Sequence, residues 1–256
     1  MWDLMNAELQ HMAELVIIVK SFLATGIMLE IKKQQYLKEI FFAFAPAKRF
    51  LLGNLPKKVL GIEKWIKTIT EKQLKEVSLF ANAKTDDMNR MSFANGLRDV
   101  MVGCQYEKSC AAWTKNWRFN DSSKDWTVYY HETIKMGMLP NVDYNNPADA
   151  FHKTLEEIAV LAERLDCTNF QKCFHAANDI LMEKRSSERL FPAMPEENER
   201  LYHAATNAWV FGARGSWNDA PPHIAGARGL GEEYKYLTTE LYSNIMHTVL
   251  YAVNEW

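Results

Sequence analysis

Residues 146–165 read NPADAFHKTLEEIAVLAERL and carry a dense set of helix signals. Asn146 can cap a helix, Pro147 suits the first helical position, and Asp149 places a negative charge near the positive end of the helix dipole. The apolar side chains then recur at helical spacing, at Phe151, Leu155, Ile158, Ala159, Ala162 and Leu165. This stretch predicts an amphipathic helix. The number of other segments with the same helical periodicity then indicates the fold class.

The same periodicity returns on both sides of this stretch. Downstream it predicts helices at 170–181, from Pro195 to about Ala208, and from about Glu232 to the terminus; upstream it predicts helices at 3–24, 28–45, 57–68, 71–83 and 86–102. Only residues 126–130 alternate as a short strand would, and a helix suits them as well. We therefore expect an all-α protein, a bundle of roughly nine to ten helices with little or no sheet.

The sequence indicates one boundary between subdomains, at 139–146, where Pro140 and three asparagines cluster. This predicts an N-terminal helical subdomain, 1–142, and a C-terminal one, 143–256, which could share one continuous core. The 256 residues are 48% hydrophobic and 24% charged, with a net charge of −2. This composition is typical of a globular protein and excludes disordered, collagen-like and short disulfide-rich classes.

Four cysteines and the absence of targeting signals indicate the compartment. Cys104 and Cys110, and likewise Cys167 and Cys173, are separated by five residues, which is not the spacing of a zinc knuckle. We expect them to be reduced. The most apolar run, 15–29, contains Lys20 and is too short to span a bilayer, and no signal peptide is evident. The sequence predicts a cytoplasmic protein with no membrane association.

Charge is distributed unevenly along the chain. Residues 27–75 contain eleven basic and four acidic side chains, whereas 143–256 contain ten basic and seventeen acidic ones. These could be solvated helix faces, or the acidic part could present a patch to a basic partner. We do not expect nucleic acid as a partner, because the lysines of 27–75 are interleaved with Ile, Phe and Leu.

No catalytic or metal-binding motif stands out. Among the His and carboxylate pairs at helical spacing, Glu8 with His11 has the Glu-x-x-His spacing, but a di-iron bundle needs more ligands. We therefore expect no metal and no cofactor. Aromatic residues form a belt that could stack on bases or sugars, although core packing explains it better; its members are Trp113, Trp117, Phe119, Trp126, Tyr129 and Tyr130.

The segment 211–223, FGARGSWNDAPPH, resists assignment to a regular element. Its Gly212, Gly215 and Ser216 suit a structural turn, and Pro221 and Pro222 are expected to exclude a helix. Trp217 either fills the core or lies exposed as an anchor for a partner. In the second interpretation a contact site forms around Arg214, Trp217, Asn218 and Asp219, because Trp and Arg are common in interface hot spots.

A resemblance rests on this segment. The pattern F-G-x-x-G-S-W-N-D, followed by a helix E-Y-x-x-L-(S/T)-x-x-L-(Y/F), resembles small bacterial domains of unassigned function that are associated with toxin-immunity proteins. The matching residues are Phe211, Gly212, Gly215, Ser216, Trp217, Asn218, Asp219, Glu233, Tyr234, Leu237, Thr238, Leu241 and Tyr242. The resemblance covers about fifty residues and implies a bacterial, intracellular protein. Here residues 220–231 are inserted between motif and helix.

Three hypotheses follow for function. The first is a non-catalytic bacterial binding protein, an immunity protein that neutralises a cognate toxin by occluding it; its contact residues would be the loop and the acidic Glu196, Glu197 and Glu199. The second is a helical enzyme with a dispersed site, in which Arg214, Asp219 and His223 around the loop act with carboxylates from other helices. The third is a structural or assembly protein, and a homodimer remains open.

Overall fold

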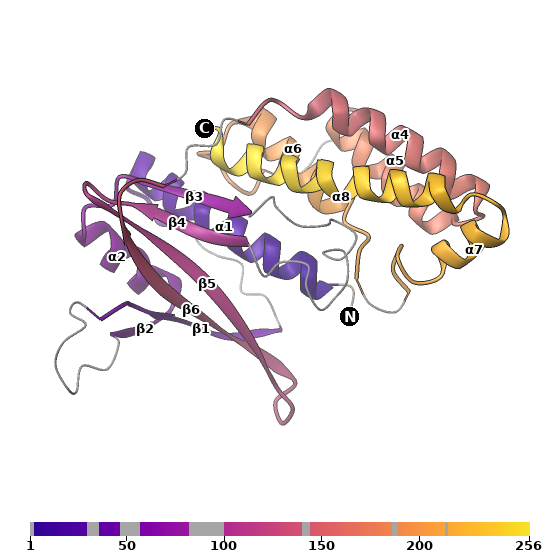
Figure 1. The fold of residues 1–256 in the computed structure, drawn as a ribbon. Coiled ribbons are helices and arrows are strands. Elements are labelled where there is room, and N and C mark those ends of the chain that lie inside the picture. Colours follow the sequence, from indigo (N-terminus) through magenta and orange to yellow (C-terminus); the bar gives the residue numbers. More distant parts are fainter. Residues whose placement is uncertain are drawn as a thin grey trace. The chain divides into compact units, whose positions relative to one another are not determined.

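The protein forms two compact units in a computed structural model that describes residues 3–29, 36–46, 57–81, 100–139, 144–185, 189–212 and 215–256. The helical unit comprises Met1–Glu14, Ala81–Asp99 and Asp143–Trp256; the sheet unit comprises Leu15–Phe80 and Val100–Val142. Helix α1 (Asp3–Thr25) contributes to both units, because the division falls after Glu14 (Figure 1).

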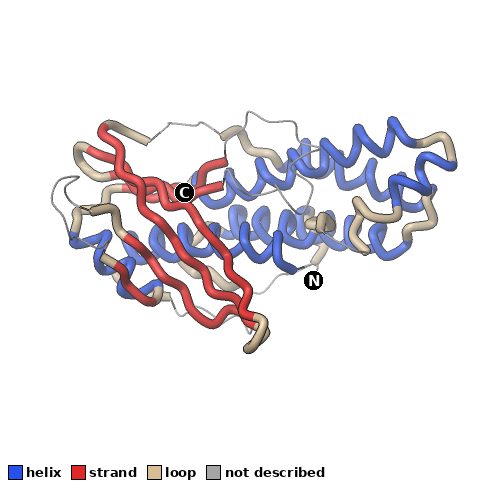
Figure 2. The backbone as a smooth tube through the Cα atoms, turned by 60° about the horizontal axis from the view of Figure 1, so that its bottom comes forward, coloured by secondary structure: helices blue, strands red, loops and turns tan. Residues whose placement is uncertain are grey.

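The described residues contain one six-stranded sheet, drawn red in Figure 2. Its strands are β1 (Leu37–Ala43), β2 (Lys58–Leu60), β3 (Glu76–Ala81), β4 (Val100–Gln105), β5 (Ser109–Asn120) and β6 (Asp125–Met136). They lie in the order β2-β1-β6-β5-β4-β3. β1 runs parallel to β6, whereas the pairs β1 with β2, β4 with β5 and β5 with β6 are antiparallel.

Strands β5 and β6 form a long hairpin closed by polar residues. The Asn120 side-chain oxygen accepts a hydrogen bond from the Ser122 N–H at 3.0 Å, and the Lys124 N–H donates to the Asn120 carbonyl at 2.8 Å. Such local side-chain bonds are typical of turns. The possible short strand at 126–130 is therefore confirmed as part of β6, a strand of twelve residues.

The core of the sheet unit is aromatic. Helix α2 (Ile62–Glu71) places Trp65 against one face of the sheet, where it stacks on Phe42 with ring centroids 4.5 Å apart. Phe42 also stacks on Tyr130 at 5.0 Å, and Trp113 meets both Phe42 and Trp65 edge to face. All four rings are fully buried. This contact fixes which face of the sheet is covered by α2.

The helical unit agrees with the sequence in its main elements. Helices α4 (Ala148–Arg164), α5 (Thr168–Leu181), α6 (Glu196–Asn207) and α8 (Gly231–Asn254) match the helices predicted there, and α1 matches the one predicted at 3–24. Helix α4 contacts α5 and α8, and α6 contacts the same two helices. Helix α4 begins one residue later than predicted, with Pro147 at the cap position, and the Asn146 side-chain oxygen accepts from the Ala148 N–H at 3.0 Å.

The expectation of an all-α bundle of nine to ten helices is wrong. The segments expected as helices at 28–45 and 71–83 contain β1 and β3, and 57–68 contains β2 as well as the start of α2. The described end of 86–102 begins β4. Short apolar runs do not distinguish a helix from a buried strand by periodicity alone, and the parallel partner of β1 is distant in sequence. Leu37 of β1, for example, lies opposite Trp126.

Two further expectations concern the membrane and the cysteines. In the described part of the chain, no helix combines the length and the apolar character needed to cross a bilayer. Cys104, Cys110, Cys167 and Cys173 are all free, and the first two are buried in the sheet unit.

Candidate functional site

Trp217 lies in the core of the helical unit with no exposed surface. Its ring packs edge to face against Phe170 and Phe174 of α5, with centroids 5.3 and 5.4 Å away. It also packs against Tyr234 of α8, with centroids 5.3 Å apart and planes inclined by 32°. The indole N–H donates to the Thr238 hydroxyl at 2.9 Å. Of the two interpretations of this tryptophan, the structure supports the core-filling one, so the side chain cannot anchor a partner in this fold.

Polar residues around Trp217 hold the loop together. The Asn218 side-chain oxygen accepts from the Gly212 N–H at 3.2 Å, and the Asp219 carboxylate accepts from the Gly215 N–H at 2.6 Å. The Ser216 hydroxyl lies 3.1 Å from the Gly212 carbonyl oxygen. Gly215 has a φ of 85°, a conformation that favours glycine. These residues shape the turn, and of the two described polar residues predicted for partner binding here, Asp219 is exposed and Asn218 is half-buried.

The residues of the alternative enzyme site are not brought together by any described contact. Arg214 lies outside the described residues. Asp219 and His223 are both exposed, and no hydrogen bond or ion pair joins them. The expectation that Pro221 and Pro222 exclude a helix is wrong, since helix α7 (Pro221–Ala227) begins at Pro221. Proline fits the first turn of a helix because the N–H it lacks has no partner within the helix.

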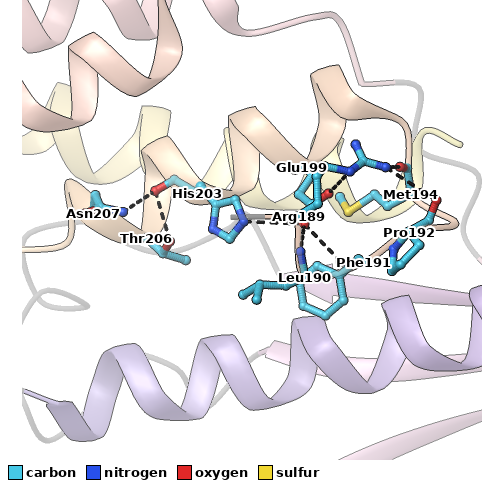
Figure 3. A network of polar contacts seen from close by, with 9 residues as sticks. All are labelled: Arg189, Leu190, Phe191, Pro192, Met194, Glu199, His203, Thr206 and Asn207. Carbon is cyan, nitrogen blue, oxygen red and sulfur yellow. Dashed lines mark hydrogen bonds and ion pairs between the residues drawn. The ribbon is translucent and has the colours of Figure 1, made fainter. Parts of the chain in front are cut away.

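Glu199 is almost fully buried on α6 and lies at the centre of a polar network (Figure 3). Its carboxylate accepts hydrogen bonds from the backbone N–H groups of Leu190 and Phe191, the latter at 2.9 Å. One carboxylate oxygen lies 3.0 Å from the Arg189 guanidinium, and the other lies 3.5 Å from Nε2 of His203. Glu199 thus fastens the segment before α6 onto the helix and does not face solvent, so its assignment to an exposed acidic surface is wrong.

Replacing Glu199 by glutamine should destabilise the helical unit by about 1–2 kcal/mol. Glutamine keeps the shape, but hydrogen bonds to a neutral oxygen are weaker than those to a carboxylate, and the ion pair with Arg189 is lost. Urea unfolding followed by far-ultraviolet circular dichroism measures this change. Glu196→Gln, on the exposed first turn of the same helix, should change stability by no more than about 0.5 kcal/mol. Equal midpoints for the two variants would contradict the role assigned to Glu199.

An acidic corner forms where α6 begins and α8 ends. We use this name for Glu196, Glu197 and Glu255, which are exposed, with the partly exposed Tyr251. The Asn198 amide ties the two helix ends together by donating to the carbonyl oxygens of Ala252 at 3.2 Å and Glu255 at 3.1 Å. Burial, and then the negative charges of Glu197 and Glu255, raise the pKa of Tyr251. The carboxylates are therefore close enough to act on one tyrosine.

Charge also separates between the units. The helical unit contains thirteen Lys and Arg against twenty-three Asp and Glu, a net of −10, and the sheet unit contains seventeen against nine, a net of +8. Glu197 in the acidic corner accepts a hydrogen bond from the Asn146 amide at 2.9 Å. Neither Glu196 nor Glu197 forms an ion pair with a described residue. These carboxylates add to an unbalanced negative field.

The aromatic belt divides between the two faces of the sheet. Trp113 and Tyr130 are core residues, as the core-packing interpretation predicted. Phe119 is 45% exposed on the same face near the hairpin turn, where it contacts Trp126. Tyr129 lies on the opposite, outer face and is partly exposed, so the core-packing interpretation does not hold for this member of the belt. Alternation along β6 is the signal that separates Tyr129 from Tyr130.

Comparisons with known proteins return no match to this chain, whether with protein-family models, with curated proteins or with solved structures.

Proposed function

We propose that this chain is a non-catalytic bacterial binding protein of the immunity type, which binds a cognate toxin and covers its active site. The observation that carries the proposal is the contact between the two halves of the resemblance. Trp217 of the loop packs on Tyr234 and bonds to Thr238, and the Tyr234 hydroxyl donates to the Trp217 carbonyl at 2.7 Å. The pattern thus corresponds to a folded substructure.

The insertion of residues 220–231 is compatible with this interpretation. It forms α7 and a short connection to α8, and it leaves the contact between the loop and α8 in place. Since the described loop residues of the pattern are used for folding, we assign toxin binding to a different surface. The acidic corner is the best candidate, because exposed carboxylates beside a tyrosine suit a basic protein partner.

Occlusion requires only a surface of sufficient size and complementary charge. A standard interface buries roughly 800 Å² on each partner, and the chain exposes 14229 Å² in total. The negative field of the helical unit would speed encounter with a basic toxin and weaken as salt rises. We further propose that the protein acts in the cytoplasm, a proposal that the four free cysteines support.

Reversing the charge of the acidic corner should weaken toxin binding at least tenfold, because like charges across an interface repel. The variant is Glu196→Lys/Glu197→Lys/Glu255→Lys. The matched control reverses three exposed carboxylates of α4 in the same unit, Glu156→Lys/Glu157→Lys/Glu163→Lys. Partners captured from the native cell are first identified, and their affinity for each variant is then measured by calorimetry at low and moderate salt.

Growth provides the functional readout. Expression of the captured partner alone should arrest growth, and co-expression of the wild-type chain or the α4 control should restore it, while the acidic-corner variant should fail to do so. If the partner is harmless, the immunity function is wrong. If both variants bind and protect equally, the toxin contacts a different surface from the acidic corner.

A further inference from the structure

The outer face of the sheet presents a row of aromatic and basic side chains across four neighbouring strands. The register places Phe41 of β1 opposite Tyr129 of β6, and their rings stack with centroids 5.2 Å apart and planes inclined by 13°. The Lys58 ammonium of β2 lies 3.9 Å from the Phe41 centroid, and the Arg118 guanidinium of β5 lies 4.8 Å from the Tyr129 centroid. We call these four residues the aromatic–cation row.

The row lies on the face that α2 does not cover. Successive residues of a strand point to opposite faces, so Phe41 faces away from Phe42, which stacks on Trp65 of α2. Lys58 and Arg118 are exposed, and Phe41 and Tyr129 are partly exposed. Four strands at about 4.8 Å spacing give the platform a width of about 14 Å.

Polar side chains surround the aromatic pair. Asn116 lies directly opposite Tyr129, and Thr114 lies opposite His131 in the adjacent row. All of these except Tyr129 are exposed. Amide, hydroxyl and imidazole groups can exchange hydrogen bonds with the edges of nucleobases. The acidic residues on this face of the described strands include Glu39, Asp125 and Glu76, and Asp125 lies 3.8 Å from the Lys38 ammonium.

We propose that this face of the sheet binds single-stranded nucleic acid, with the Arg118 guanidinium, supported by the Tyr129 ring, as the surface on which a base stacks. Unpaired bases stack on aromatic rings and on guanidinium planes, and a positive groove or face holds the phosphates. Phe41, Lys58 and Arg118 all contact the Tyr129 ring, so the exposed Arg118 guanidinium, supported by this ring, is the plane that a base can reach. Lys58 supplies a phosphate contact, and the sheet unit as a whole carries a net charge of +8.

This inference differs from the sequence-based expectation about nucleic acid. The sequence-based argument against nucleic acid is that the lysines of 27–75 are interleaved with apolar residues. In strands, that alternation separates two faces: Lys58 and Phe41 share the outer face, whereas Phe42 packs in the core. The site lies in the sheet unit and does not involve the acidic corner. Its test is therefore independent of the proposed immunity function.

The experiment measures fluorescence anisotropy of labelled 20-nucleotide oligo(dT) and oligo(rU) with the full chain, at 50 and 200 mM salt. Both single strands should bind, with affinity falling as salt rises, and a 20-base-pair duplex should bind at least tenfold more weakly because its bases are already stacked. Tyr129→Ala should weaken single-strand binding about tenfold. Phe119→Ala, which removes an exposed ring from the opposite face, should leave the affinity unchanged.

Substitutions at the exposed Arg118 separate the contribution of stacking to affinity from the contribution of charge, and they leave the core unchanged. Arg118→Lys keeps the charge and should lose affinity with an unchanged salt slope, whereas Arg118→Gln should lose more and reduce the slope by about 0.7. Lys64→Gln, an exposed lysine of α2, is the charge control and should bind like the wild type.

Three results would overturn the proposal: duplex binding equal to single-strand binding, Arg118→Lys and Tyr129→Ala both binding like the wild type, or polyglutamate displacing the oligonucleotide as well as unlabelled oligo(dT) does. The last result would instead identify an acidic protein surface as the partner of this face.

Discussion

Replacing Trp217 by alanine should lower the free energy of unfolding of the helical unit by about 3–5 kcal/mol. The substitution removes a fully buried indole from between α5 and α8, and it leaves the Thr238 hydroxyl without the N–H that donates to it. A cavity of this size is not refilled by neighbours that are themselves large rings, Phe170, Phe174 and Tyr234. Urea unfolding monitored by the helical circular dichroism signal measures the loss.

Graded variants separate packing from hydrogen bonding at this site. Tyr234→Phe removes only the hydroxyl that donates to the Trp217 carbonyl, and we expect it to cost about 1 kcal/mol. Tyr236→Ala is the control on the same helix, since this ring is 61% exposed and its loss should matter little. A loss below about 1 kcal/mol for Trp217→Ala would show that the loop is not anchored by its tryptophan.

Replacing Glu14 by glutamine should stabilise the protein by roughly 3 kcal/mol at pH 8 and have little effect at pH 4. Burial on α1 raises the pKa of Glu14 to about 7. The carboxylate also acts on Tyr202, whose pKa is raised by burial and then by the charge of Glu14. Glutamine carries no charge at any pH, so it removes the free-energy cost of ionising this buried position.

The sign of this pH dependence follows from which state, folded or unfolded, retains the Glu14 proton. Below the unfolded pKa of about 4.5, Glu14 is protonated in both states and adds no pH dependence. Between about 4.5 and 7 the folded state retains a proton that the unfolded state releases, so wild-type stability falls as pH rises. Above about 7 the penalty is constant. Urea unfolding at pH 4, 6 and 8 should therefore give a difference between the variant and the wild type that grows with pH; a difference independent of pH would contradict the assignment.

Helices with local signals could be predicted from the sequence. The Asn146 cap, Pro147 and the apolar stripe of α4 all act within one or two turns, and the structure contains that helix from Ala148. The start of α6 after Pro195 is similar. Such signals depend on neighbouring residues alone, because helix hydrogen bonds join residues four positions apart.

Strands could not be predicted in the same way. The backbone hydrogen bonds of β1 are formed partly with β6, about ninety residues later in the sequence. β4 pairs with the neighbouring strand β5, but its sequence gives no strand signal either. Both faces of β4 are largely buried, so the alternation that would mark a strand is hidden there. In β6 it is hidden for another reason: aromatic residues occupy both faces, with Tyr130 in the core and Tyr129 outside.

The candidate sites show the same division. Sequence spacing placed Glu196, Glu197 and Glu199 together on the first turn of one helix, and they are there. Only the fold turned Glu199 inward, where it pairs with Arg189. The fold also placed the end of α8 against α6, where the Asn198 amide binds the Glu255 carbonyl and both Glu197 and Glu255 act on Tyr251.

The sequence by itself determined the four longer helices of the C-terminal half, the loop that carries Trp217 and the opposite charges of the two ends, because each of these depends on composition or on residues within a few positions. Tertiary structure alone decided that Trp217 is buried, that Glu199 is an internal anchor, and that Lys58, Phe41, Tyr129 and Arg118 form one row on a sheet. The physical reason is that burial and strand pairing depend on residues brought together from distant positions, and no local pattern records which of them will meet.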